Sequence, residues 1–211
     1  MTRKRKLFSP VHRFILVLAL LVFFFCLVLG LFLENRKTVI QSLEERLSVL
    51  TETTAPLKFM VLSREQGTIS ARFRFYDTGG KELASFEQSW PGGELTLDSI
   101  IIPAGTRFLA FPCRIFTDAV APGEGTVIFD FYDRDGFPAI YDDPSLDETL
   151  RHDLEVFFAR ARTAADYSDD SEPEPGVYGN AVHDLQHLAR FEPGVIYTLE
   201  YHASGAVEIR E

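Results

Sequence analysis

Cysteine is nearly absent from this chain of 211 residues, which holds only Cys26 and Cys113. Cys26 lies in a long apolar run and Cys113 stands alone in the rest of the chain, so the sequence offers no disulfide framework. The folded part must therefore be stabilised by its hydrophobic core. With 19 Phe and 7 Tyr, the chain has the apolar surface to build one, which excludes disorder over most of its length.

Acidic residues are absent from positions 1–33, where five cations lie. Because the whole chain has a formal net charge of −10, residues 34–211 carry −10 − 5 = −15. Nucleic-acid binding works by neutralising phosphates with cations, so a part with this charge is a poor candidate for it. We expect no nucleic acid among the partners.

Charge of either sign is absent from residues 14–33, which read FILVLALLVFFFCLVLGLFL. A helix of 20 residues is roughly 30 Å long, the thickness of the hydrocarbon core of a bilayer, so the run predicts a transmembrane helix. A cleaved signal peptide is the alternative, but its apolar core is usually about 7–15 residues long and ends in a small-x-small site that this run lacks. A lipoprotein site at Cys26 would need small residues where Phe23, Phe24 and Phe25 stand.

The cations before the apolar run predict its orientation. Five lie within residues 1–13, and cytoplasmic flanks carry such an excess of Lys and Arg. We therefore expect a signal-anchor in the cell membrane, with a cytoplasmic tail over residues 1–13 and the C-terminal part outside the cytoplasm, in the periplasm if the source is bacterial. The lipid bilayer is then the first partner.

A juxtamembrane helical stem is predicted over residues 34–56. Its apolar residues are spaced 3, 4, 3, the pattern of a coiled coil, and are Ile40, Leu43, Leu47 and Leu50. One interpretation is that this seam joins two chains or a protein partner. The other is that the short helix packs its stripe on its own domain.

Residues 57–211 are predicted to form an α+β domain outside the cytoplasm. Alternating apolar and polar residues separated by Gly and Pro turns indicate an antiparallel, sandwich-like β structure. The expected strands span residues 69–76, 81–90, 95–102, 108–115 and 127–131, followed by a C-terminal hairpin over 195–209. Pro112 indicates an edge position or a bulge in its strand.

Two covering helices complete the predicted fold. The first begins with a capping box at Ser145 and Glu148, and its apolar stripe includes Leu150, Leu154 and Phe158. An acidic loop at about 164–178 precedes a shorter helix over 180–190. Strands, helices and a final hairpin in this order are typical of an α+β domain.

The sequence contains only weak candidates for metal-binding or catalytic residues. His183 and His187 are four residues apart on the short helix and could share a metal, but the glutamate of a zinc-protease HExxH motif is missing. Asp130, Asp133 and Asp135 do not fit the ligand spacing of an EF-hand and are better explained by a hairpin tip. Cys113 lies in an apolar strand and is expected to be a core residue.

The sequence thus identifies no catalytic residue and no cofactor-binding residue, and we expect no cofactor. Its organisation favours a non-enzymatic interaction or scaffold module of the cell envelope, tethered to the membrane. The alternatives are a membrane-anchored, metal-dependent hydrolase using His183 and His187, or a sensor domain that binds a small ligand.

Residues 14–33 should remain in the mature protein with the N-terminus inside, because the run is too long for a signal-peptide core and follows five cations. Intact-mass measurement of the membrane-extracted chain should show residues 1–33 still attached. Protease added to intact spheroplasts should degrade the part after Glu34. A mature N-terminus at or beyond Gly30 would contradict the prediction.

Overall fold

The computed structural model describes residues 18, 20–30, 47, 50, 52–165, 178–179 and 191–211. The chain divides into two units, Met1–Leu43 and Glu44–Glu211. In the first unit, residues 18 and 20–30 are helical and expose their apolar side chains. Within the described part of the chain, none of the helices combines the length and apolar character that a membrane crossing requires.

The second unit is α+β, as predicted, and its strands pair antiparallel. One sheet has five strands in the order β11-β10-β1-β2-β3. These strands are β1 (Thr53–Glu65), β2 (Thr68–Tyr76), β3 (Glu82–Pro91), β10 (Ile196–His202) and β11 (Val207–Arg210). Gln66 and Gly67 connect β1 to β2 with positive φ angles of 51° and 73°, as a two-residue hairpin turn requires.

The second sheet has four strands in the order β6-β5-β4-β9. They are β4 (Leu95–Ala104), β5 (Arg107–Thr117) and the two-residue strands β6 (Thr126–Val127) and β9 (Tyr178–Gly179). A hydrogen bond of 2.6 Å between the hydroxyls of Ser99 in β4 and Tyr201 in β10 joins the two sheets. After β5 the chain forms three short 3-10 helices and a small hairpin. The 3-10 helices are η1 (Pro122–Glu124), η2 (Phe129–Phe131) and η3 (Ala139–Tyr141), and the hairpin consists of β7 (Asp133–Arg134) and β8 (Phe137–Pro138).

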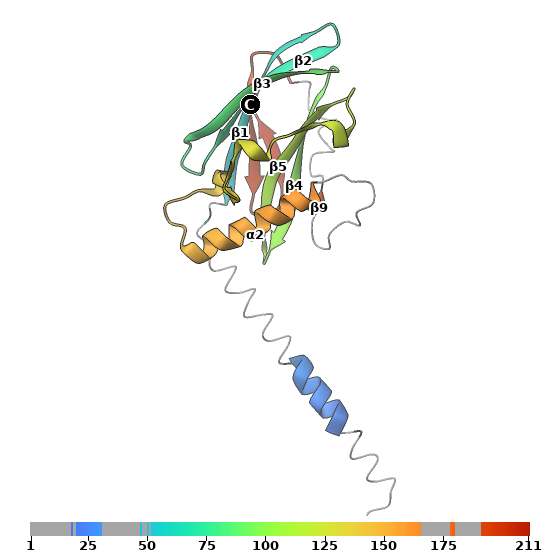
Figure 1. Ribbon diagram of the computed structural model, residues 1–211, viewed down its shortest axis with the longest axis vertical. Coiled ribbons are helices and arrows are strands. Elements are labelled where there is room, and N and C mark those ends of the chain that lie inside the picture. The colour runs from blue at the N-terminus through green and yellow to red at the C-terminus, as the bar shows by residue number, and fades with distance from the viewer. Residues whose placement is uncertain are drawn as a thin grey trace, which may run out of the picture. The chain divides into compact units, whose positions relative to one another are not determined.

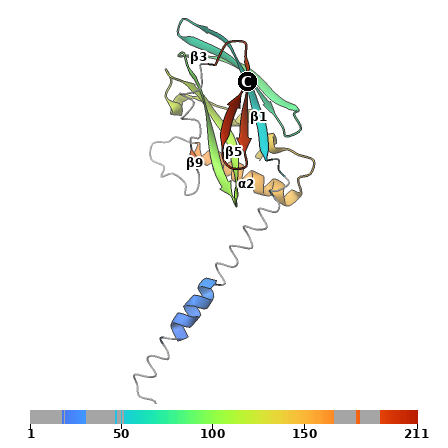
Figure 2. The same cartoon turned by 180° about the vertical axis from the view of Figure 1, so that it is seen from behind.

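Helix α2 (Glu148–Ala164) contacts β4, β5 and β8 and buries the predicted residues Leu150, Leu154 and Phe158. Figure 1 and Figure 2 show α2 on one side of β4 and β5, and β1 and β10 on the other. The β4–β5 hairpin is therefore the middle layer of three. This explains why its strands are buried almost throughout, instead of alternating between buried and exposed residues.

Pro112 marks a bulge, one of the two outcomes predicted for it. Asp98 pairs with Arg114 and Ser99 with Pro112, so Cys113 is the extra residue of β5. The bulge changes the alternation of the strand, and the Arg114 guanidinium donates to the carbonyl of Ala165 at the end of α2 over 3.0 Å.

Two local predictions were wrong. Residues 127–131 do not form a strand, because Phe129–Phe131 is the 3-10 helix η2. This turn directs Phe129 against Phe158 of α2 and Phe131 against Phe86 of β3, which a straight strand could not do. The capping box at Ser145 is also absent. The N-cap of α2 is Asp147, whose carboxylate accepts from the backbone N–H of Leu150 over 2.7 Å.

Ser145 is engaged elsewhere, which explains the shifted cap. Its backbone N–H donates to Asp143 Oδ1 over 2.8 Å, and its hydroxyl donates to the same oxygen. These hydrogen bonds hold the pKa of Asp143 below its ordinary value, because they favour the charged carboxylate. Ser145 thus closes a turn before the helix instead of capping it.

Asp147→Ala should lower the free energy of unfolding by about 1 kcal/mol, because it removes the N-cap hydrogen bond. Ser145→Ala, the matched control, should cost less than about 0.5 kcal/mol, as for an exposed residue away from the cap. Denaturant unfolding of the full chain in detergent measures both. A loss for Asp147→Ala no larger than that for Ser145→Ala would show that the Asp147 cap does not stabilise the helix.

Candidate functional site

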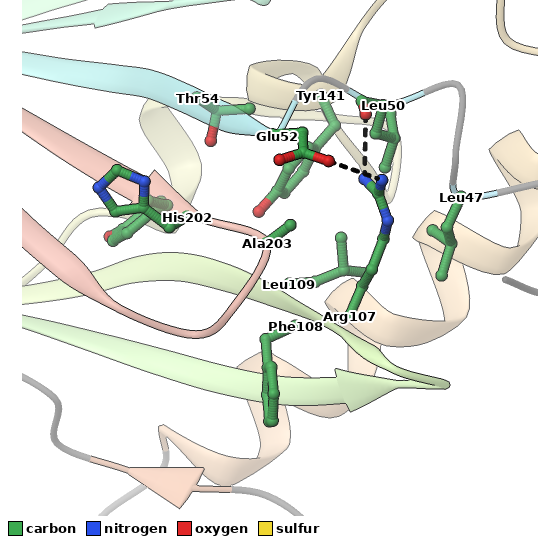
Figure 3. Close-up of a pocket in the computed structure, with 11 residues that line it drawn as sticks. Leu47, Leu50, Glu52, Thr54, Arg107, Phe108, Leu109, Tyr141, His202 and Ala203 are labelled. Carbon is green, nitrogen blue, oxygen red and sulfur yellow. Dashed lines mark hydrogen bonds and ion pairs between the residues drawn. The ribbon is translucent and has the colours of Figure 1, made fainter.

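A pocket lies where the chain enters the second unit, at the tips of two hairpins (Figure 3). One wall consists of the start of β1 and the segment before it, which we call the entering segment and which contributes Leu47, Leu50 and Glu52. The tip of the β4–β5 hairpin forms a second wall, and the end of β10 forms a third. Its lining residues are Leu47, Leu50, Glu52, Thr54, Arg107, Phe108, Leu109, Tyr141, Tyr201, His202 and Ala203. The enclosed space has room for about one water molecule, which excludes a metabolite-sized ligand in this conformation.

Arg107 holds the segment before β1, which contains Leu50 and Glu52, against the rest of the second unit. Its guanidinium donates to the carbonyl of Leu50 over 3.2 Å and lies 3.6 Å from the Glu52 carboxylate. The Glu52 side chain is 88% exposed, so water screens this ion pair and the hydrogen bond to Leu50 is the stronger restraint. The backbone adds a further connection, since Ala203 donates to the carbonyl of Glu52 over 2.8 Å.

The apolar part of the pocket includes two residues of the predicted stem seam. Leu47 is fully buried and Leu50 is 7% exposed. Residues of the same chain account for this burial. For this end of the stem, the burial favours packing on its own domain. Ile40 and Leu43 lie outside the described residues, so an association through the other half of the seam stays a prediction.

The tyrosines of the pocket have structural roles. The hydroxyl of Tyr141 donates to the carbonyl of Ala110 over 2.8 Å and accepts from its N–H over 3.0 Å. The hydroxyl of Tyr201 bonds with Ser99. Burial raises the pKa of both phenols well above the ordinary value, because the charged form would lose its solvation. Neither tyrosine can therefore act as a base at neutral pH.

A second group of polar residues lies at the end of β10 and on β11. Among the residues that the structure describes, Glu200, His202 and Glu208 are the one group of three whose ligand atoms could hold a metal ion. Their ligand atoms lie within 4.8 Å of one another. His202 also lines the pocket, at the far side from Arg107 in Figure 3. The pocket and this group thus meet at His202.

The predicted metal residues His183 and His187 lie outside the described residues. Asp133 and Asp135 lie in the β7–β8 hairpin, as expected, whereas Asp130 lies in η2. Arg162 pairs with Asp130 over 3.1 Å and also with Asp133. Asp133 additionally accepts from the N–H of Gly136 over 2.7 Å. Cys113 is fully buried, and burial raises the pKa of its thiol, which disfavours the thiolate that a nucleophile needs.

Sequence reasoning placed the candidate metal site at His183 and His187 and missed Glu200 and Glu208. Glu200 and His202 are two residues apart on a strand, and Glu208 lies across the following turn. A Glu-x-His alternation before a Ser-Gly turn was the available signal, but the pairing register that brings Glu208 opposite Glu200 is visible only in the structure.

Comparison with known proteins identifies no relative: no protein-family model matches the chain, and no curated protein or solved structure is similar to it.

Arg107→Gln should loosen the entering segment. Loss of a hydrogen bond worth about 1 kcal/mol corresponds to about a fivefold larger population of the detached segment. Limited proteolysis of the full chain in detergent should then show cleavage within residues 44–52 about fivefold faster. Arg72→Gln is the matched control, since Arg72 pairs with Glu87 across β2 and β3, which contribute no residue to the pocket. Equal cleavage rates in the two variants would show that Arg107 does not hold the segment.

Proposed function

We propose that this chain is a bitopic, membrane-anchored envelope protein whose extracytoplasmic domain is a non-enzymatic interaction or scaffold module. The observation that carries the proposal is the uncharged run of 20 residues with five cations before it. In lipid such a run has to be helical, because every backbone group must be bonded internally. The side chains of residues 20–25, which include Phe23, Phe24 and Phe25, are 56% exposed or more. A lipid environment would relieve this unfavourable exposure to water.

Several features of the second unit support binding over catalysis. The polar groups around the pocket bond mainly with other protein groups: Arg107 with Leu50 and Glu52, and the two tyrosines with Ala110 and Ser99. The space between them has room for about one water molecule, which also disfavours a small-ligand sensor. A hydrolase based on His183 and His187 would depend on residues that the structure does not describe.

The undescribed half of the predicted stem seam is the surface that we propose for a partner. Since Leu47 and Leu50 are buried in the domain, the apolar residues left for another protein are Ile40 and Leu43. Burial of a Leu or Ile side chain contributes roughly 1.5–3 kcal/mol of free energy, so a partner that covers Ile40 and Leu43 would be stabilised by this amount for each residue. Two chains tethered in one membrane also meet at a high effective concentration, so a short contact is enough.

The double variant Ile40→Asp/Leu43→Asp should lose its crosslinked adducts in membranes while the domain keeps its melting temperature, because these residues precede the folded unit. Val156→Asp is the matched control: Val156 is 47% exposed on α2, so adducts and melting temperature should both stay unchanged. Leu47→Asp should instead lower the melting temperature, because it places a charge at a fully buried position.

Two outcomes would count against this proposal. Unchanged crosslinking of the Ile40→Asp/Leu43→Asp variant would show that the stem does not join proteins. A lower melting temperature of that variant would show that these residues pack on the domain, as Leu47 does.

A further inference from the structure

The end of the last hairpin brings an imidazole and two carboxylates together on one face of a sheet. Glu200 and His202 are two residues apart on β10, and side chains at this spacing lie on the same face of a strand. Glu208 is the register partner of Glu200 on β11. The antiparallel pairing therefore places three potential metal ligands on neighbouring positions of a rigid backbone.

The distance between His202 and Glu208 suits a shared ion better than a direct hydrogen bond. His202 Nε2 lies 3.6 Å from Glu208 Oε1, too far for a hydrogen bond. Metal–ligand bonds of about 2.0–2.2 Å in a tetrahedral zinc site place neighbouring ligand atoms roughly 3.3–3.6 Å apart. The Nε2 atom is buried and has no hydrogen-bond partner, although the His202 side chain is 22% exposed. An ion between these groups would satisfy that nitrogen.

The surroundings of His202 orient it as a ligand. Its other nitrogen, Nδ1, lies 3.1 Å from the hydroxyl oxygen of Thr53 in β1. When Nδ1–H donates to Thr53, the lone pair of the neutral imidazole is on Nε2, which faces Glu208. Thr53 is thus a positioning residue for the group.

Arg210 contacts the outer oxygens of both carboxylates. Its guanidinium lies 3.1 Å from Glu200 Oε2 and 2.8 Å from Glu208 Oε2, so the other oxygen of each glutamate is available. With two carboxylates and one guanidinium, the group carries a net charge of −1, which favours a cation.

We propose that Glu200, His202 and Glu208 form a binding site for a divalent transition-metal ion of the zinc class. One imidazole nitrogen with two carboxylate oxygens is a ligand set for zinc, whereas calcium prefers six or more oxygens. Three protein ligands leave the fourth tetrahedral position for water or for a side chain of a partner. The site lies at the end of β10 that lines the pocket, close to the point where the chain enters the domain.

Equilibrium dialysis of the full chain in detergent against zinc chloride tests the site. The background variant His183→Ala/His187→Ala removes the other candidate ligands and should still bind one zinc ion per chain. In that background, His202→Ala should abolish the binding. Glu208→Gln and the positioning variant Thr53→Val should each weaken it by about tenfold or more.

A matched control and a folding check keep the test decisive. His152→Ala should leave zinc binding unchanged, because His152 is 74% exposed on α2, where it lies 3.4 Å from Glu155. Circular dichroism without zinc should show that all variants are folded, since Glu208 and His152 are exposed residues. Zinc should raise the melting temperature of the background variant but not that of its His202→Ala derivative.

The proposal is overturned if the background variant binds no zinc, or if His202→Ala binds it as tightly as the background does. Zinc binding that depends only on His183 and His187 would assign the metal to the residues predicted from the sequence. These results are independent of the anchor and the stem, so they leave the proposed interaction role untouched.

Discussion

Burial of the β4–β5 hairpin on both faces is the constraint on which the rest of the structure depends. Every residue of β5 from Leu109 to Thr117 is buried, with the first sheet on one side and α2 on the other. Each fully buried Leu, Ile or Phe side chain contributes roughly 1.5–3 kcal/mol, so this hairpin supplies a large part of the core. Three features lie on this hairpin or at its tip: the pocket, Arg107 with its hydrogen bond to Leu50, and the bulge at Cys113.

A strand buried on both sides leaves little room for unpaired polar groups, and the polar residues there are bonded. Arg114 donates to the carbonyls of Gly123 and Ala165, which connects β5 to η1 and to the end of α2. Ser99 bonds with Tyr201 of the opposite sheet, and Thr117 donates to the carbonyl of Pro91. These contacts offset the cost of burying polar groups and also fix how the three layers meet.

The strands that carry one buried and one solvated face could be predicted from the sequence, because their alternation is local. This holds for β2 and β10. Sequence reasoning failed where a distant contact decides. Thr53 belongs to β1 because it pairs with His202. The N-cap of α2 was misassigned for a different reason: Ser145 bonds with Asp143, two residues before it, which leaves the cap to Asp147. Strand register brings together Glu200, His202 and Glu208, and a local sequence pattern does not specify this register.

Amide hydrogen exchange on the full chain tests the central role of the β4–β5 hairpin most directly. If both faces of this hairpin are covered, its amides should be the slowest to exchange in the domain, because they open only with global unfolding. The amides of β3, which pairs only with β2 among the described strands, should exchange faster. Protection of β4 and β5 no greater than that of β3 would contradict the three-layer account.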